Sequence, residues 1–297
     1  MATYFLGIDG GASAGKWSLI DSGGIEISCG VDAAIDGHIY KDESRRHLSD
    51  FLEKIEPNLR DHVSGVHCGL TGISTNSDTR ELELLISSIF TKSKVSVEQD
   101  VVLGYRSHFE NKEGIFLYAG TGSVAITMKD GKYVDVGGWG YLLGDEGGGY
   151  WIAIQGLRHL LFQFERIEKP TKLSMSISNL IDCHNWDDVR EFVYSRTRSE
   201  IAKLARLVIE NLDKDEAADA IINSATQELA ELVRRAISIS HLPDPEIYFG
   251  GGIARSHPTI KSRVEKALNR NIKISTEDYS RAAAEIARNS YITSSTK

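Results

Sequence analysis

The 297-residue chain has few cysteines, few prolines and no excess of basic residues. Its three cysteines, Cys29, Cys68 and Cys183, are scattered and form no CxxC pair. This pattern predicts reduced thiols and argues against a disulfide framework or a zinc site. With 5 prolines and 41% hydrophobic residues, the chain can bury a sizeable core, and long disordered tracts are not expected.

The formal net charge of −8 excludes another group of functions. No basic stretch is present to neutralise a phosphate backbone, so a general nucleic-acid binder or a membrane-surface binder is not expected. A nucleotide held by local contacts is compatible with the same charge. No apolar run approaches membrane-spanning length, and the first residues lack the charge pattern of a signal peptide. We therefore expect a soluble, cytoplasmic protein.

The segment YFLGIDGGASAGKWSLI at residues 4–20 contains a glycine-rich stretch. The spacing of Gly10, Gly15 and Lys16 fits a P-loop, but that motif continues with a Ser or Thr that ligates magnesium. Here the next residue is Trp17. Residues 17–21 are short and apolar, and they are followed by Ser-Gly-Gly and an alternating segment, as expected for strands and not for a helix. The sequence therefore predicts strand, glycine turn and antiparallel strand, and the P-loop is the weaker interpretation.

This opening pattern recurs after residue 114. Both halves begin with three predicted strands, of which the first two are joined by a glycine-rich turn, so we expect duplicated domains rather than a short-period solenoid. The expected domains are residues 1–111 and residues 112–297, the second with a helical insertion, and the last helix can pack back on the first domain. Predicted strands are 63–70, 94–98, 114–119, 124–128, 133–136 and 246–249, and predicted helices are 42–55, 78–90, from 100, 200–212, 215–239, 257–268 and 276–289.

The order of three glycine motifs resembles the sugar kinase, Hsp70 and actin superfamily. The motifs are Asp9-Gly-Gly, Gly120-Thr-Gly-Ser and Gly250-Gly-Gly, each after a predicted strand. Between them, the segment GGWGYLLGDEGGGYW at residues 137–151 resembles the N-acetylglucosamine kinase and BadF/BadG/BcrA/BcrD ATPase group. The resemblance implies an α/β fold of two duplicated ribonuclease-H-like (actin-like ATPase) domains with a nucleotide and substrate cleft between them. It also implies ATP, Mg²⁺ and a homodimer.

Glycine suits a phosphate-binding hairpin because backbone amides can approach the oxygens closely. Asp9, at the end of the first strand, is suited to hold hydrated Mg²⁺, although an ordinary turn aspartate is the alternative. Ser13 stands where the family has Thr, and whether Lys16 contacts phosphate is left open. The residues expected to bind the nucleotide are Asp9, Gly10, Gly11, Ser13, Lys16, Gly120, Thr121, Gly122, Ser123, Gly250, Gly251 and Gly252.

Phosphorylation of a hydroxyl requires a base near its proton, and Asp100 matches the catalytic aspartate of the family. It follows a predicted strand and begins a predicted helix. The alternative role is a helix N-cap, which aspartate fills well. Since one carboxylate can do both, we favour Asp100 as the general base.

A second set of residues is expected to bind the acceptor sugar. By resemblance, Asp145 would accept hydrogen bonds from ring hydroxyls and Trp139 would form an apolar wall. Glycines flank Asp145 and Glu146, so we expect both acids to be accessible. The alternatives are N-cap acids for the following helix and, for Trp139, a core tryptophan. The loop at residues 31–38 lacks the Pro and Asn found in N-acetylglucosamine kinases, and a carboxylate there suits the amine of glucosamine. The set is Asp36, His38, Thr71, Gly72, Trp139, Gly140, Asp145 and Glu146.

Three functions are compatible with these motifs. The leading one is an ATP-dependent kinase that phosphorylates a hydroxyl of an amino sugar or hexose, with glucosamine or N-acetylglucosamine as the expected acceptor. The second is a BadF-type ATPase that activates a partner dehydratase by ATP-driven electron transfer, which requires paired cysteines for an iron–sulfur cluster. The third is a sugar sensor without catalysis, which the presence of Asp100 disfavours.

Overall fold

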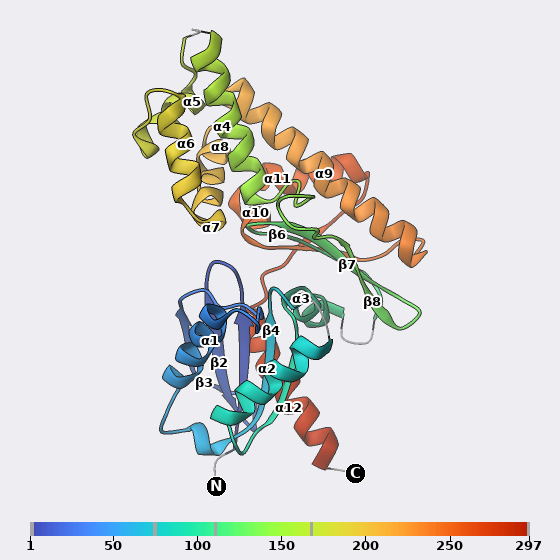
Figure 1. Ribbon diagram of the computed structural model, residues 1–297. Coiled ribbons are helices and arrows are strands. Elements are labelled where there is room, and N and C mark those ends of the chain that lie inside the picture. The colour runs from blue at the N-terminus through green and yellow to red at the C-terminus, as the bar shows by residue number, and fades with distance from the viewer. Residues whose placement is uncertain (1–2, 74–75, 110–111, 167–168, 296–297) are drawn as a thin grey trace. The chain divides into compact units, whose positions relative to one another are not determined.

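The computed structural model describes residues 3–73, 76–109, 112–166 and 169–295 (Figure 1). The chain divides into two compact units. Unit 1 comprises Met1–Glu110 and Thr276–Lys297, and unit 2 comprises Asn111–Ser275. Residue 111, the last residue of the first domain expected from the sequence, lies outside the described residues. Each unit is described by itself below.

Unit 1 is built on a five-stranded mixed sheet with the strand order β3-β2-β1-β4-β5. The first three strands form an antiparallel meander, and β4 and β5 run parallel to β1. The strands are β1 (Tyr4–Gly10), β2 (Gly15–Asp21), β3 (Glu26–Asp32), β4 (Val63–Leu70) and β5 (Lys94–Gln99).

Side chains of β1 point alternately to the two faces of the sheet, and each face packs against its own layer of helices. Leu6 and Ile8 are buried in a cluster with residues of α1 and α2, whereas Phe5 packs with Ala284 and Ala287 of α12. Strand residues of opposite parity point to opposite faces of a sheet, so each face has its own helical cover. The helices are α1 (Asp42–Lys54), α2 (Asn76–Ile89), α3 (Asp100–Phe109) and α12 (Tyr279–Ser295), with a short 3₁₀ turn at Arg60–His62.

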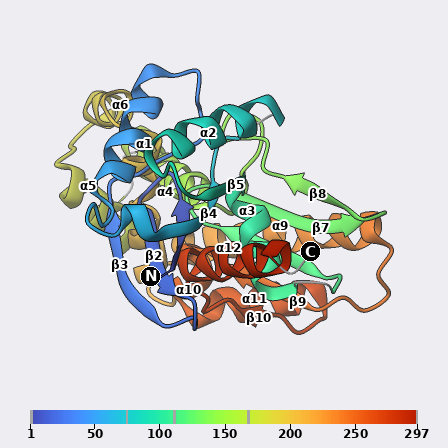
Figure 2. The ribbon, with the colours of Figure 1, turned by 90° about the horizontal axis from the view of Figure 1, so that it is seen from below.

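The helix α12 belongs to unit 1 although unit 2 separates it from the rest in sequence (Figures 1 and 2). Its backbone lies directly on β1: a Cβ added to Gly7 would come within 2.0 Å of the Ser280 carbonyl oxygen and 2.1 Å of the Ala284 amide nitrogen. Only glycine leaves room for this approach. The conformation of β1 therefore depends on a helix contributed by the last residues of the chain.

Unit 2 contains a second five-stranded sheet, with the order β10-β9-β6-β7-β8. Its first three strands are again an antiparallel meander, and β9 is parallel to β6. Read from β8 to β10, the sheet repeats the plan of unit 1, which confirms the duplicated fold. The strands are β6 (Ile115–Ala119), β7 (Ser123–Lys129), β8 (Lys132–Gly137), β9 (Ile247–Gly250) and β10 (Lys273–Ile274).

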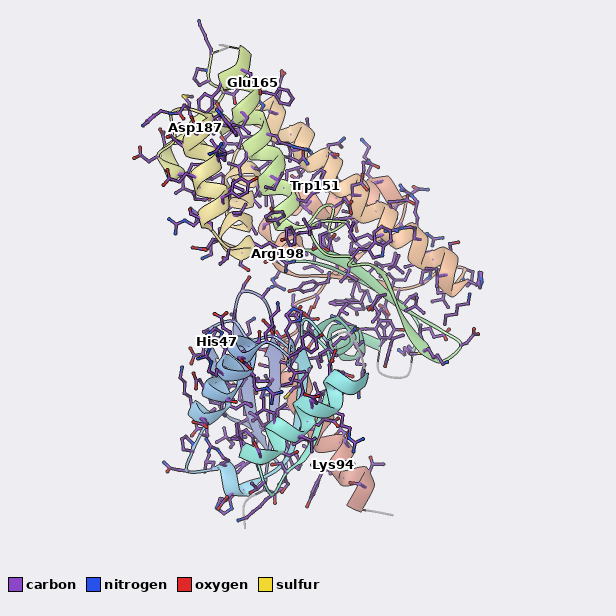
Figure 3. All side chains as sticks on the ribbon, in the orientation of Figure 1. His47, Lys94, Trp151, Glu165, Asp187 and Arg198 are labelled. Atoms are coloured by element: carbon purple, nitrogen blue, oxygen red, sulfur yellow. The ribbon has the colours of Figure 1, made fainter. Side chains whose placement is uncertain are left out.

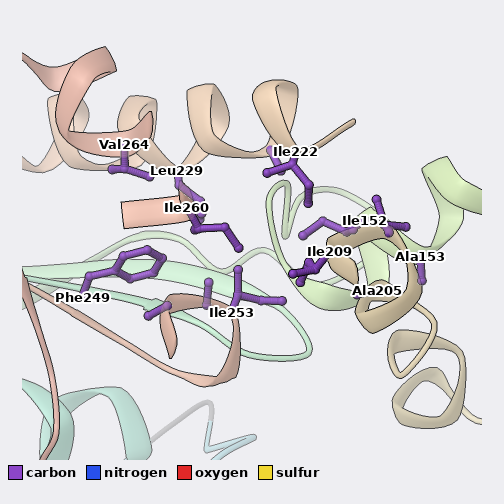
Figure 4. Packing of buried hydrophobic residues seen from close by; sticks show 14 of the residues in the cluster. Ile152, Ala153, Ala205, Ile209, Ile222, Leu229, Phe249, Ile253, Ile260 and Val264 are labelled. Carbon is purple, nitrogen blue, oxygen red and sulfur yellow. The ribbon is translucent and has the colours of Figure 1, made fainter. Parts of the chain in front are cut away.

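The helices of unit 2 bury a large apolar cluster, part of which is drawn in Figure 4. There Ile152 of α4, Ile209 of α8 and Ile222 of α9 point toward one another. The helices are α4 (Gly149–Arg166), α5 (Lys172–Ile181), α6 (Trp186–Ser195), α7 (Arg198–Ala202), α8 (Ala205–Glu210), α9 (Glu216–Ser240), α10 (Gly252–Ser256) and α11 (Pro258–Leu268).

The single helix predicted over residues 200–212 is wrong. The structure has two short helices, α7 and α8, joined by i→i+3 hydrogen bonds from Lys203 to Glu200 and from Leu204 to Ile201.

Within the described ranges, no helix is both long and apolar enough to cross a membrane.

Candidate functional site

The carboxyl ends of β1, β4 and β5 form one edge of the unit 1 sheet. Gly10 is paired with Leu70, and Leu70 is paired with Gln99. The residues that follow these strands therefore leave the sheet along the same edge, where parallel α/β sheets place their ligands. The Thr71 amide, directly after β4, donates a hydrogen bond to the Gly10 carbonyl oxygen at 2.9 Å. The edge thus joins the first glycine turn to the loop after β4.

The glycine turn between β1 and β2 is a hairpin. The two strands pair antiparallel through Gly10 and Gly15, and the Gly11 amide donates to the Ala14 carbonyl oxygen at 3.1 Å. A P-loop would continue from the glycines into a helix, but residues 15–21 are a strand. The strand–turn–strand prediction is confirmed, and the P-loop interpretation is wrong.

Asp9 and Lys16 are directly opposite each other on the paired strands β1 and β2. Burial raises the pKa of Asp9 to about 6; Lys16 acts in the opposite direction, and the carboxylate of Asp278 adds to the increase. Lys16 also helps to lower the pKa of Asp278. The ammonium group of Lys16 therefore lies in the field of two carboxylates, one from the first strand and one from just before α12.

Among the described residues, the Asp9 carboxylate accepts no hydrogen bond. A partly buried carboxylate with a raised pKa and no donor is suited to a cation, and Mg²⁺ usually takes only one or two carboxylates and keeps several waters. Asp9 therefore fits the magnesium that an ATP site requires.

Four of the residues expected to bind the acceptor lie together in unit 1. The Gly37 amide donates to the Thr71 carbonyl oxygen at 2.7 Å, and Asp36 Oδ1 accepts a hydrogen bond from the His38 amide at 2.9 Å. The His38 ring packs on Gly72, where an added Cβ would come within 2.8 Å of the ring and where φ is +80°. The loop after β3 is thus joined to the loop after β4, at the edge that also carries Gly10.

Asp100 is the first residue of α3 and directly follows β5. Its Oδ1 accepts a hydrogen bond from the Val101 amide at 2.9 Å. Next to it, Gln99 Nε2 donates to the Ile73 carbonyl oxygen at 3.2 Å, which ties the end of β5 to the loop after β4. Asp100 therefore lies on the edge that carries Asp9.

The second glycine turn, Gly120–Ser123 in unit 2, is held by the first residues of α4 and by the segment before them. The carbonyl oxygens of Gly120 and Thr121 accept from the amides of Gly149 and Tyr150 at 2.8 and 2.9 Å. Ser123 Oγ donates to the Glu146 carbonyl oxygen at 2.6 Å. The hydroxyl of Ser123, expected to serve the nucleotide, thus also fixes the loop that carries Asp145 and Glu146.

The prediction that Asp145 is accessible is wrong, because the residue is only 7% exposed. Its carboxylate accepts hydrogen bonds from the amides of Gly140 and Ser123, and an added Cβ on Gly122 would come within 2.3 Å of its Oδ2. Burial raises the pKa of Asp145, while Arg198 and the two amides oppose the increase. Glycines on either side did not expose this acid, since the loop folds back on the second hairpin.

Two arginines beside this loop were not anticipated, whereas the exposure of Trp139 agrees with the expected role and not with its alternative. Trp139 is 61% exposed, so it is no core tryptophan, and the Arg235 guanidinium lies 5.1 Å from the centre of its ring. Arg198 Nη1 lies 3.9 Å from Asp145 Oδ2. Arg198 was missed because no motif surrounds it and it is distant in sequence from the loop.

The three glycines after β9 have different surroundings. Gly251 has φ +95°, and a Cβ there would come within 2.2 Å of the Ala119 carbonyl oxygen. Gly252 has an ordinary backbone conformation, and nothing lies within 4 Å of an added Cβ. Gly251 is therefore required by the fold, whereas the open space at Gly252 is available to a ligand.

This difference predicts opposite results for two alanine variants. Gly251→Ala should destabilise the protein by about 2–4 kcal/mol, because the methyl group meets backbone in a conformation that favours glycine. Gly252→Ala should keep wild-type stability and raise the KM for ATP if the nucleotide occupies the open space. Thermal unfolding and ATP titration of both variants test this, and an unchanged KM in Gly252→Ala would exclude the nucleotide from that position.

The raised pKa of Asp9 predicts a stability change that depends on pH. The pKa of this carboxyl is about 6 in the folded protein, against an ordinary value of 3.8. The folded protein therefore loses stability as the pH rises from the ordinary pKa through 6, because Asp9 must then ionise in a partly buried position. Asp9→Asn should therefore be more stable than wild type by roughly 1–3 kcal/mol at pH 8, and the difference should vanish below about pH 4. Urea unfolding across this range measures it.

Asp278→Asn is the matched control for that measurement. The pKa of Asp278 is lowered through hydrogen bonds from Ser280 and Arg281 that oppose its burial. Its charge therefore stabilises the fold above its ordinary pKa, and the variant should lose stability at pH 8. A gain in stability at pH 8 in both variants would contradict the assignment of the destabilising charge to Asp9.

Comparison with known proteins gives relatives along nearly the whole chain. A protein from Clostridium acetobutylicum named N-acetylmuramic acid/N-acetylglucosamine kinase is 28% identical over 281 residues, covering 90% of this chain and 91% of that protein. A protein from Dictyostelium discoideum named N-acetyl-D-glucosamine kinase is 26% identical and covers 96% of this chain and 98% of its own.

The fold has close structural counterparts as well. The crystal structure of a candidate N-acetylglucosamine kinase from Chromobacterium violaceum matches with a TM-score of 0.80 at 19% identity, over 96% of this chain and 99% of that chain. Residues 6–286 match the BadF/BadG/BcrA/BcrD ATPase family. With two actin-like units and this match over most of its length, the chain belongs to the BadF/BadG/BcrA/BcrD ATPase family.

Proposed function

We propose that this protein is an ATP-dependent kinase that phosphorylates a hydroxyl of an amino sugar or a hexose. The observation that carries the proposal is the edge of unit 1, formed by three adjacent parallel strands. Asp9 lies one residue before the end of β1, and Thr71 and Asp100 directly follow β4 and β5. A carboxylate suited to a metal and a carboxylate suited to a base lie on the same edge. The names of the two curated relatives support a sugar as the acceptor.

In the proposed reaction, backbone amides of the glycine-rich turns would bind phosphates of ATP. Asp9 would hold Mg²⁺, which neutralises the charge of the phosphates when it is bound. Asp100 would accept the proton of the acceptor hydroxyl as the oxygen attacks the terminal phosphate. Because Asp100 Oδ1 already accepts from the Val101 amide, the carboxylate is fixed in orientation.

The loop after β3 carries the proposal for the acceptor. The Asp36 carboxylate would pair with the ammonium group of glucosamine in a charge-assisted contact that an N-acetyl group cannot form. With an acetylated sugar the same carboxylate would be left desolvated, which penalises that competitor. His38, on the same loop and against Gly72, would supply a second polar contact.

The electron-transfer alternative requires cysteines that can share a cluster. Cys68 and Cys183 are buried in the two units, and burial raises the pKa of both thiols. Only Cys29, on β3, is exposed. One exposed thiol per chain gives two in a dimer, and a [4Fe–4S] cluster held by thiolates takes four. We therefore favour the kinase.

A coupled assay of ADP release across amino sugars and hexoses tests the proposed function. We expect release that depends on the sugar, with glucosamine used at least as well as N-acetylglucosamine. Asp36→Asn should shift the ratio of kcat/KM toward the acetylated sugar. No sugar-dependent release with any acceptor would refute the kinase, whereas a strong preference for the acetylated sugar that Asp36→Asn leaves unchanged would refute only the role of Asp36.

Replacement of Asp100 tests the base. Asp100→Asn keeps the shape of the side chain but removes the proton acceptor, so sugar-dependent turnover should fall by about two orders of magnitude or more. Since the amide can still accept from Val101, α3 should begin at the same residue and ATP binding should be retained. Turnover near the wild-type rate would exclude Asp100 as the base.

A further inference from the structure

Arg198 lies in unit 2 at the beginning of α7, where Figure 3 labels it. The start of this helix is fixed by a capping box, in which Thr197 and Glu200 exchange hydrogen bonds. The guanidinium lies 5.5 Å from the centre of the Tyr141 ring. Tyr141 in turn packs edge to face on Tyr150, with ring centres 5.2 Å apart. Both the backbone and the charged group of Arg198 are therefore held in place.

This guanidinium lies beside the second glycine hairpin. Its neighbour Asp145 accepts a hydrogen bond from the Ser123 amide and packs against Gly122. At the other end of α7, Ala202 lies against Gly149, whose amide donates to the Gly120 carbonyl oxygen at 2.8 Å. The helix that carries Arg198 thus packs against the segment that holds the hairpin.

The hydrogen-bond donors of Arg198 are not used by the described part of the chain. Asp145 Oδ2 is 3.9 Å from Nη1, beyond hydrogen-bond distance, and the central carbon of the guanidinium lies over the Tyr141 ring, 5.5 Å from its centre. The Asp145 carboxylate is already bound by two amides. The Arg198 side chain is 35% exposed, so solvent or a ligand can reach it. A guanidinium has five donors arranged for the oxygens of a carboxylate or phosphate.

We propose that Arg198 binds an anionic oxygen group of a ligand held beside the second hairpin. The inference deepens the proposed kinase function and rests on it for the identity of the ligand. Two sources present this chemistry: the terminal phosphate of ATP, and the carboxylate of an acidic amino sugar. In either case the ligand oxygens accept hydrogen bonds from Arg198 donors that Asp145 does not use, while the Tyr141 ring keeps the guanidinium in position.

The experiment compares wild type with Arg198→Gln, which removes the charge, and Arg198→Lys, which keeps the charge but loses the paired donors. Arg206→Gln is the matched control, since Arg206 is 79% exposed and pairs with Glu210 on α8. Calorimetric titration with ATP, ADP and N-acetylmuramic acid measures binding directly. Steady-state rates with N-acetylglucosamine and N-acetylmuramic acid measure turnover.

If the anion is the terminal phosphate, Arg198→Gln should bind ATP about tenfold or more weakly, with ADP binding unchanged and both sugars affected alike. If it is the sugar carboxylate, only N-acetylmuramic acid should lose binding and kcat/KM by that factor. In both cases Arg198→Lys should be intermediate and Arg206→Gln should match wild type.

Equal binding of all three probes by wild type and Arg198→Gln would overturn the proposal. So would absence of binding of both ATP and N-acetylmuramic acid by the wild type, because no anion would then be held there. If wild type binds a probe but phosphorylates neither sugar, the kinase function fails, and the loss or retention of that binding in Arg198→Gln still decides the role of Arg198.

Discussion

The alignment of β1, β4 and β5 is the constraint on which the geometry of unit 1 depends. Because Gly10, Leu70 and Gln99 lie in register, the three following segments must begin at one edge. The hydrogen bonds from Thr71 to Gly10 and from Gln99 to Ile73 then join these segments to one another. Asp9 and Asp100, the carboxylates proposed for the metal and the base, are brought to the same edge in this way, since the backbone of the sheet positions both.

The two hairpins also share an electrostatic arrangement. In unit 1 a cation, Lys16, lies opposite the partly buried acid Asp9; in unit 2 a cation, Arg198, lies near the buried acid Asp145. In both places burial raises the pKa of the acid and the cation opposes it. The acids differ in their remaining partners: Asp145 is bound by two amides, whereas Asp9 has none among the described residues. Asp9 is therefore the one suited to a metal, and in unit 2 the cation is the group with unused capacity.

The sequence was sufficient to predict most of the fold because hydrophobic alternation and glycine turns are local signals. The hairpin at residues 10–15, the repeated meander and the start of α3 at Asp100 all follow from residues close in sequence. The break between α7 and α8 was not predictable in this way, since no proline or glycine interrupts the periodicity. It arises where the chain turns to pack both short helices against α4.

The candidate site shows the same division between local and distant signals. Asp145 was expected to be accessible because its neighbours are glycines, but these glycines instead let the loop approach the hairpin: a Cβ on Gly148 would come within 2.7 Å of the Gly122 backbone. Besides the nearby Gly140 amide, the partners of Asp145 are the Ser123 amide and Arg198, both distant in sequence. Likewise, Asp278 reaches the field of Asp9 only because α12 returns to β1 across Gly7. A motif can therefore identify an acid, whereas the pKa of that acid depends also on residues outside any motif, here Arg198 and Asp278.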